Sequence, residues 1–139
     1  MNYWDSSAVI PLLVKEEHTP HRKEQLEDDP RMTVWWACQL ECSSALNRLN
    51  REGSLDGEGL AQALRALETL ADSWYEVQPT SELRARAMRL LRVHPLRAAK
   101  SVQLAAALIA TSEDPSHLPF LTADDRLREA AWKEGFAVA

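Results

Sequence analysis

Apolar residues recur along most of this 139-residue chain at the three-to-four-residue spacing of amphipathic helices, interrupted by short apolar runs typical of strands. Gly53 and the His94-Pro95 pair supply helix stops, since glycine often follows a helix end and a residue before proline leaves the α region. The pattern predicts helices over 6–14, 18–28, 37–52, 58–72, 80–92, 96–110 and 124–134. It predicts strands over 2–5, 32–35, 74–77, 119–121 and 136–138.

Short strands that alternate with helices are typical of parallel βαβ units, which place helices on both faces of a sheet. The helix over 96–110 is apolar nearly all round, which predicts that it is buried. We therefore predict an α/β fold: a single domain over 1–139, built as a three-layer α/β/α sandwich with a mostly parallel central sheet.

Composition excludes some classes of protein. Hydrophobic residues make up 45% and charged residues 27% of the chain, as in ordinary soluble domains. A net charge of -5 excludes a strongly basic nucleic-acid-binding protein but permits a local basic surface. The opening is too short and polar for a signal peptide, and no apolar run approaches the ~20 residues that span a bilayer. We expect a cytoplasmic protein with no membrane partner.

Cys38 and Cys42 lie one helical turn apart. A zinc site would need two further ligands at suitable spacing, and the sequence offers none. We predict that both thiols fill the core as small apolar groups. The four histidines show no metal-ligand spacing and are assigned no chemistry.

Acidic residues occur where predicted strands give way to helices. Asp5 follows the first strand and Asp124 follows the strand over 119–121. In open α/β folds the carboxyl ends of the strands line the ligand crevice, so both side chains are candidate site residues. For Asp124 an alternative is that it caps the following helix, because aspartate is a favoured N-cap residue.

Glu41 projects from the edge of the apolar stripe of its predicted helix, where a charged residue is unusual unless it is paired or liganded. The alternative is a first-turn glutamate stabilised by the helix dipole. Together Asp5, Glu41 and Asp124 could hold Mg²⁺ or Mn²⁺, which prefer oxygen ligands. Such an ion can generate hydroxide and offset charge on a phosphodiester during hydrolysis.

Four segments in this order resemble the PIN-domain nucleases and, within them, the VapC-type toxins of bacterial toxin–antitoxin pairs. The resemblance covers essentially the whole chain. Its segments are Tyr3–Ala8, Glu41–Leu46, Leu96–Leu108 and Leu121–Leu127.

The resemblance implies a Mg²⁺- or Mn²⁺-dependent endoribonuclease that hydrolyses RNA. Its catalytic and metal residues would be Asp5, Glu41 and Asp124, with Ser7 and Thr122 beside the site. It also implies a homodimer held inactive by a small cognate antitoxin whose tail reaches the acidic site.

Lys100 departs from the family pattern. After Leu-Arg-Ala-Ala the family carries an aspartate, usually a metal-site residue, and no other acid lies between Glu82 and Glu113. Three outcomes stay open. Lys100 could replace the metal and leave a module that only binds RNA or an antitoxin. It could contact the scissile phosphate beside one bound metal, or it could extend to solvent.

The stretch from Arg84 to Arg97 is the one concentrated basic segment. Its candidate RNA contacts are Arg89, Arg92 and Arg97, and the alternative is an ordinary solvated helix face. Trp35 and Trp36 are adjacent, so on a strand they would face opposite ways. One could lie on a surface, but the core is predicted for both because helices cover both faces of the sheet.

Overall fold

The computed structural model describes residues 1–139 and is built around a four-stranded sheet whose strands all run parallel, in the order β3-β2-β1-β4. The strands are β1 (Asn2–Trp4), β2 (Met32–Trp35), β3 (Tyr75–Val77) and β4 (Phe120–Leu121). Tyr3 pairs with Thr33 on one side and with Phe120 on the other, so β1 lies in the middle of the sheet. The predicted parallel sheet is confirmed.

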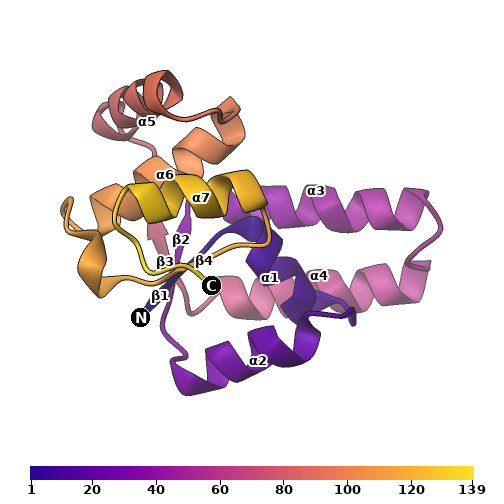
Figure 1. Cartoon of the computed structure of the whole chain (residues 1–139). Helices are drawn as coiled ribbons and strands as arrows, with labels where there is room; N and C mark the ends of the chain where they lie inside the picture. Colours follow the sequence, from indigo (N-terminus) through magenta and orange to yellow (C-terminus); the bar gives the residue numbers. More distant parts are fainter.

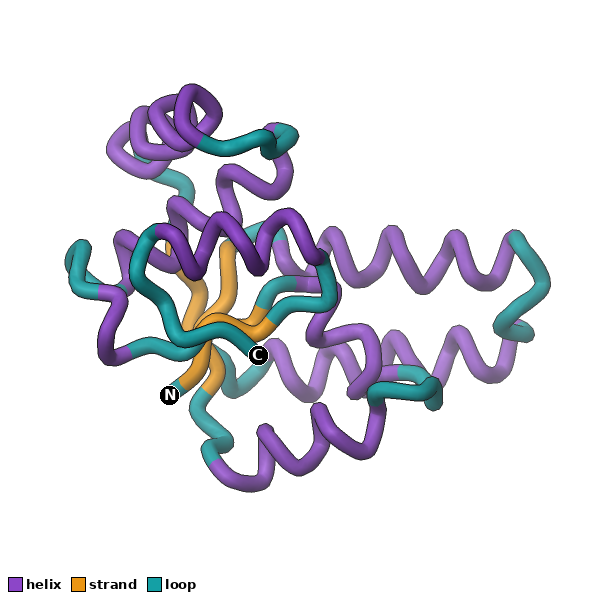
Figure 2. Tube along the Cα trace, viewed as in Figure 1, coloured by secondary structure: helices purple, strands orange, loops and turns teal.

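Seven α-helices surround the sheet in the predicted places (Figure 1; Figure 2). One face of the sheet is covered by α1, α3 and α4, and α2 packs against α1. The other face is covered by α5, α6 and α7. The bounds are α1 (Ser6–Leu13), α2 (Thr19–Asp28), α3 (Cys38–Arg51), α4 (Gly57–Ala71), α5 (Ser81–Val93), α6 (Ala98–Ala110) and α7 (Asp125–Lys133), with a 3-10 turn η1 (Pro115–His117). This is the predicted three-layer α/β/α sandwich.

The strands supply alternate side chains to two separate cores, because successive residues of a strand point to opposite faces. Tyr3 and Phe120 belong to the core beneath α5, α6 and α7, while the next residues, Trp4 and Leu121, belong to the core beneath α1, α3 and α4. The Tyr3 and Phe120 rings stack with centroids 5.0 Å apart, and Phe136 tilts against Phe120 at 5.5 Å. The aromatic contact fixes the lateral position of β1 against β4.

Helices α3 and α4 run side by side as a hairpin that extends away from the sheet (Figure 1). Its base is held by the predicted apolar stripe, in which Cys38, Cys42 and Leu46 are fully buried. Both cysteines are free thiols, so their predicted place in the core is confirmed. Gly53 supplies the predicted stop, with the positive φ of 80° that glycine adopts most readily.

Two details of the sequence-based prediction were wrong. The segment 136–138 forms no full strand, since only Val138 makes a bridge, to Phe120. Trp36 is 48% exposed rather than buried, because β2 ends at Trp35 and Trp36 begins the turn to α3. Its ring lies edge-on to Trp35, which is in the core as predicted. None of the helices combines the length and hydropathy needed to cross a membrane.

A pair of leucines on α3 tests the importance of the hairpin base. Leu46→Ala removes a fully buried side chain and is expected to lower the free energy of unfolding by about 2–5 kcal/mol. Leu40→Ala, on the same helix but 69% exposed, is expected to change it by less than about 0.5 kcal/mol. Urea denaturation measures both, and equal losses would contradict the placement of α3.

Candidate functional site

The site is centred on Asp5, which lies at the carboxyl end of the central strand and is completely buried. Its Oδ2 accepts hydrogen bonds from the hydroxyl of Ser7 and from Thr122 Oγ1 (2.9 Å), and Lys100 Nζ lies 3.4 Å from the same atom. Its Oδ1 is buried with no hydrogen-bond partner. Asp5 therefore keeps one carboxylate oxygen fixed and one free.

The hydroxyls beside Asp5 tie the loop after β4 to α1. Ser7 Oγ accepts the backbone N–H of Ala123 at 2.9 Å, and Thr122 Oγ1 accepts that of Asp124 at 3.0 Å. Each hydroxyl thus donates to Asp5 and accepts from the loop. The structure places Ser7 and Thr122, the predicted neighbours of the site, in contact with Asp5.

Two arginines that were not identified from the sequence bind the backbone of the loop after β4. Arg22 Nη2 and Arg128 Nη2 donate to the carbonyl oxygen of Thr122 at 3.0 and 2.7 Å. Arg22 is only 5% exposed, and burial, followed by the charge of Arg128, lowers its pKa. These contacts fix the backbone at Thr122 and so the direction of its hydroxyl. No local pattern marks Arg22, because it lies a hundred residues from Thr122.

Lys100 lies in the first turn of α6 and directs its ammonium at Asp5. Its side chain is 29% exposed, so it forms one wall of the site and does not extend freely into solvent. Of the three outcomes left open by the sequence, extension to solvent is the one that this position contradicts. The positive group stands against the acid that a metal ion was predicted to bind.

Glu41, in the first turn of α3, is half-buried and oriented by a chain of hydrogen bonds. Gln103 Nε2 donates to Glu41 Oε1 at 2.7 Å, and the Tyr3 hydroxyl donates to Gln103 Oε1 at 2.7 Å. Burial, followed by the charge of Asp5, raises the pKa of Glu41, while Lys100 and Gln103 act in the opposite direction. Sequence analysis missed Gln103, although an amide in an otherwise apolar buried helix was a usable signal.

Asp124 serves as the N-cap of α7. Its Oδ1 accepts the backbone N–H of Leu127 at 2.8 Å. This is the capping alternative that the sequence left open, and it occupies one carboxylate oxygen in stabilising the helix.

The residues as arranged do not fit a divalent cation. No group of three or more His, Cys, Asp or Glu side chains is placed to hold a metal ion. Asp5 has a free oxygen, but the nearest charged group is the ammonium of Lys100, which would repel a divalent ion at that point. Metal binding by Asp5, Glu41 and Asp124 stays a prediction that this arrangement does not support.

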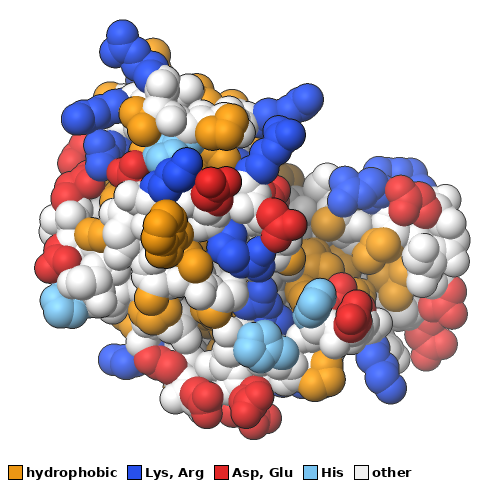
Figure 3. All heavy atoms as spheres, viewed as in Figure 1, with side chains coloured by type: hydrophobic (Ala, Val, Ile, Leu, Met, Phe, Trp, Pro, Cys, Tyr) orange, Lys and Arg blue, Asp and Glu red, His pale blue; other side chains and the backbone are white.

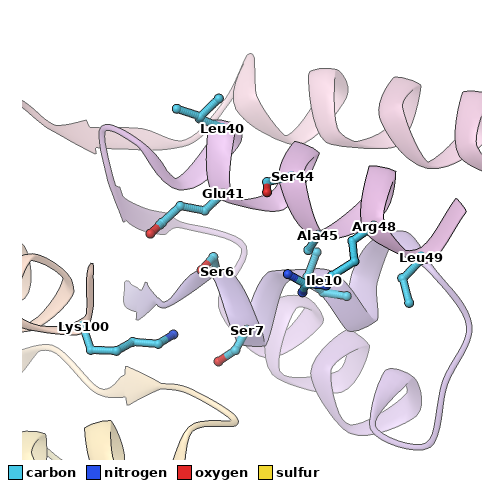
Figure 4. A pocket seen from close by; sticks show the side chains of 10 residues that line it. All are labelled: Ser6, Ser7, Ile10, Leu40, Glu41, Ser44, Ala45, Arg48, Leu49 and Lys100. Atoms are coloured by element: carbon cyan, nitrogen blue, oxygen red, sulfur yellow. The ribbon is translucent and has the colours of Figure 1, made fainter. Parts of the chain in front are cut away.

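A cavity of about 600 Å³ opens in front of these residues, between α1, α3 and the start of α6. Figure 4 shows the Lys100 side chain extending towards Ser7, with Glu41 and Arg48 projecting from α3. The volume falls in the ~300–1,000 Å³ range of ligand pockets. The lining residues are Ser6, Ser7, Ile10, Leu40, Glu41, Ser44, Ala45, Arg48, Leu49 and Lys100.

The predicted RNA contacts on α5 lie apart from this cavity. Arg89 and Arg92 are exposed on α5, where basic groups gather in Figure 3, and Arg97 is the exposed N-cap of α6. None of them lines the cavity beside Lys100. Their role in RNA binding stays a prediction, and an ordinary solvated helix face stays the alternative.

Arg86 and His94, also in the basic stretch, contact acids within the protein. Arg86 pairs with Glu113 at 2.9 Å and lies 3.8 Å from Glu134. His94, assigned no chemistry from its spacing, is buried and lies 2.7 Å from Glu134. These contacts join α5 to the segment after α6, through Glu113, and to the end of α7, through Glu134.

The fold recurs in solved structures of very different sequence. One is the crystal structure of PAE2754 from Pyrobaculum aerophilum, with a TM-score of 0.67 and 19% identity over 99% of this chain and 89% of that chain. Another is a toxin–antitoxin complex from Klebsiella pneumoniae, where a chain matches with a TM-score of 0.67 and 14% identity over 100% of this chain and 96% of that chain. At such identities the likeness shows the fold alone. No protein-family model and no curated protein matches the sequence.

The capping role of Asp124 can be separated from a role as metal ligand. Asp124→Ala removes the acceptor of the Leu127 N–H and is expected to lower the free energy of unfolding by about 1 kcal/mol. Asp124→Asn keeps a good cap and is expected to retain wild-type stability. Thermal unfolding of both variants measures this, and an Asn variant as unstable as the Ala variant would contradict the capping role.

The raised pKa of Glu41 predicts a pH-dependent effect of Glu41→Gln. A carboxyl whose pKa is raised in the folded state favours folding while it is protonated. That contribution is lost as pH rises from the ordinary glutamate value of about 4.3 through the raised value. We therefore expect Glu41→Gln to match the wild type at acidic pH and to be more stable at neutral pH.

Urea unfolding at both pH values provides the measurement for Glu41. Glu82→Gln is the matched control, because Glu82 is also a first-turn glutamate but is exposed. Both variants lose the same interaction with a helix dipole, so only Glu41→Gln should gain stability with pH. Parallel pH profiles for the two variants would contradict the prediction.

Proposed function

We propose that this chain is the toxin-type member of a toxin–antitoxin pair, a PIN-like module that binds RNA at the cavity in front of Asp5. In this proposal the ammonium of Lys100 supplies the positive charge that receives a phosphate group. A small antitoxin is the second partner. The proposal rests chiefly on the 3.4 Å contact between Lys100 Nζ and Asp5 Oδ2.

The fold supports the toxin assignment. This chain matches a chain of the Klebsiella toxin–antitoxin complex over its whole length and over 96% of that chain. The four sequence segments that resemble VapC-type toxins contain Asp5, Glu41, Lys100 and Asp124, and the first three lie at or beside the cavity. The structural likeness and the sequence resemblance both support the same class of protein.

Electrostatics supports phosphate rather than metal as the ligand of the site. Lys100 lies beside Asp5, and α1, α3 and α6 begin close to the cavity, at Ser6, Cys38 and Ala98. Helix N-termini carry partial positive charge and unpaired N–H groups, which favour anions. This positive charge would attract a phosphodiester and repel a divalent cation.

A second candidate is the metal-dependent endoribonuclease implied by the sequence resemblance. The observation that favours it is Asp5 Oδ1, a fully buried carboxylate oxygen with no hydrogen-bond partner. A bound cation would satisfy this atom, provided that Lys100 moved away from its present place.

Metal titration separates the two candidates. By isothermal calorimetry with Mn²⁺ we expect no binding to the wild type, because Lys100 occupies the site, and binding to Lys100→Asp, which restores an acid there. Lys133→Asp makes the same change in charge at the exposed end of α7 and is expected to show no Mn²⁺ binding. Asp5→Asn in the Lys100→Asp background is expected to abolish the gained binding.

RNA binding in the presence of a chelator completes this test. The wild type is expected to bind a labelled single-stranded RNA without metal, and Lys100→Ala to bind it more weakly. If the wild type instead binds Mn²⁺ through Asp5 and cleaves RNA only with metal, the endoribonuclease candidate replaces the proposal. If it binds neither RNA nor metal, both candidates are wrong.

A further inference from the structure

The cavity holds a second cation that the proposed function does not use. Arg48 lines it together with Lys100, two helical turns along α3 from Glu41. Lys100 is paired with Asp5, whereas Arg48 makes no ion pair within the chain. Figure 4 shows the Arg48 side chain turned towards Ile10 of α1, across the cavity from its own helix. An unpaired guanidinium directed into a cavity is available to an anionic ligand.

The surface between the two cations combines apolar and hydroxyl groups. Ile10, Ala45 and Leu49 form the apolar part, and Ser6, Ser7 and Ser44 contribute hydroxyls. A polynucleotide strand matches this combination, because its phosphates are anionic and its nucleosides present flat apolar faces with polar edges. The cavity is thus a short groove with a cation towards each end.

We propose that Arg48 is a phosphate-binding residue of this groove, and that it holds the same RNA strand as Lys100 at a neighbouring phosphate. The inference rests on the proposed function and adds to it the path of the RNA strand. The strand would run from Lys100, at the start of α6, along α3 to Arg48. The planar guanidinium presents paired N–H donors that match phosphate oxygens, which a lysine at this place would not do.

An acidic polypeptide is the competing ligand for such cations, and Glu41 argues against it. The Glu41 carboxylate lines the groove between the two cations and needs a donor from any ligand that passes it. A ribose 2′-hydroxyl is both donor and acceptor, so RNA can donate to Glu41 while its phosphates contact the cations. Aspartate and glutamate side chains offer only acceptors when ionised, so an acidic peptide could donate to Glu41 only through its backbone N–H groups.

The test compares Arg48→Gln with Arg51→Gln in full-length protein. Both residues are exposed in the last turn of α3, so the two substitutions change helix charge alike, but Arg51 does not line the cavity. Affinity for a labelled single-stranded RNA is measured in chelator at several salt concentrations. Arg48→Gln is expected to bind about tenfold more weakly, with a salt slope reduced by about 0.7, the value for one phosphate contact on a single strand. Arg51→Gln is expected to behave as the wild type.

Each outcome has one meaning. If the wild type does not bind RNA, the proposed function fails, whatever Arg48 does. If the wild type binds RNA and the two variants behave alike, only the inference about Arg48 is overturned. A loss of affinity with an unchanged salt slope, or with a lowered melting temperature, would make Arg48 a structural residue and overturn it as well. Polyglutamate that binds as tightly as RNA, and loses affinity in Arg48→Gln, would make the groove a peptide site.

Discussion

The arrangement of the rest of the site depends on the buried carboxylate of Asp5. A charge removed from water must be compensated inside the protein, and Asp5 is completely shielded from solvent. Its compensation comes from α1 through Ser7, from the loop after β4 through Thr122, and from α6 through Lys100. Three elements that are distant in sequence are therefore held at the end of one strand. Loss of any of these groups leaves part of the charge without a partner.

This dependence explains why a lysine is tolerated at the start of a helix. A cation in the first turn of α6 is disfavoured by the helix dipole, by roughly 0.3–1 kcal/mol. The attraction to Asp5 and Glu41 opposes that cost, and the partial exposure of Lys100 leaves its ammonium partly hydrated. Asp5 thus has an opposite charge beside it without any bound ion. An anion can approach its exposed side, where the lysine meets the cavity.

Much of the fold could be predicted from the sequence because the deciding signals are local. Apolar spacing, Gly53 and Pro95 marked the helices, and the position of Asp5 followed from the end of the first strand. Trp36 was misplaced because it was treated as a strand residue, although it follows the predicted strand end at Trp35 and begins the turn to α3. The segment 136–138 was overestimated because a strand requires a partner along its length, and only Val138 has one.

The site was predictable in outline only. The end of the first strand indicated Asp5, the edge of an apolar stripe indicated Glu41, and the family resemblance indicated Lys100. Whether Lys100 faces the acids depends on the packing of α6 against the sheet. Asp124 shows the opposite case, since its cap with Leu127 is a contact over three residues that the sequence could suggest. Arg22 and Gln103 act on partners 62 to 100 residues away, and Arg48 faces α1 across a cavity that no local pattern predicts.

The projecting hairpin of α3 and α4 gives the two ends of the groove different local stability. Between Leu46 and Ala63 no residue is fully buried, whereas the base of α3 is anchored by Cys38, Cys42 and Leu46. Backbone amides with few buried contacts open more often and exchange their hydrogens sooner. Amide exchange should therefore be slow around Glu41 and progressively faster past Arg48 towards Gly57. A ligand that spans the groove would contact a rigid part of α3 at one end and a more mobile part at the other. Ordering the mobile part would reduce the affinity for that ligand.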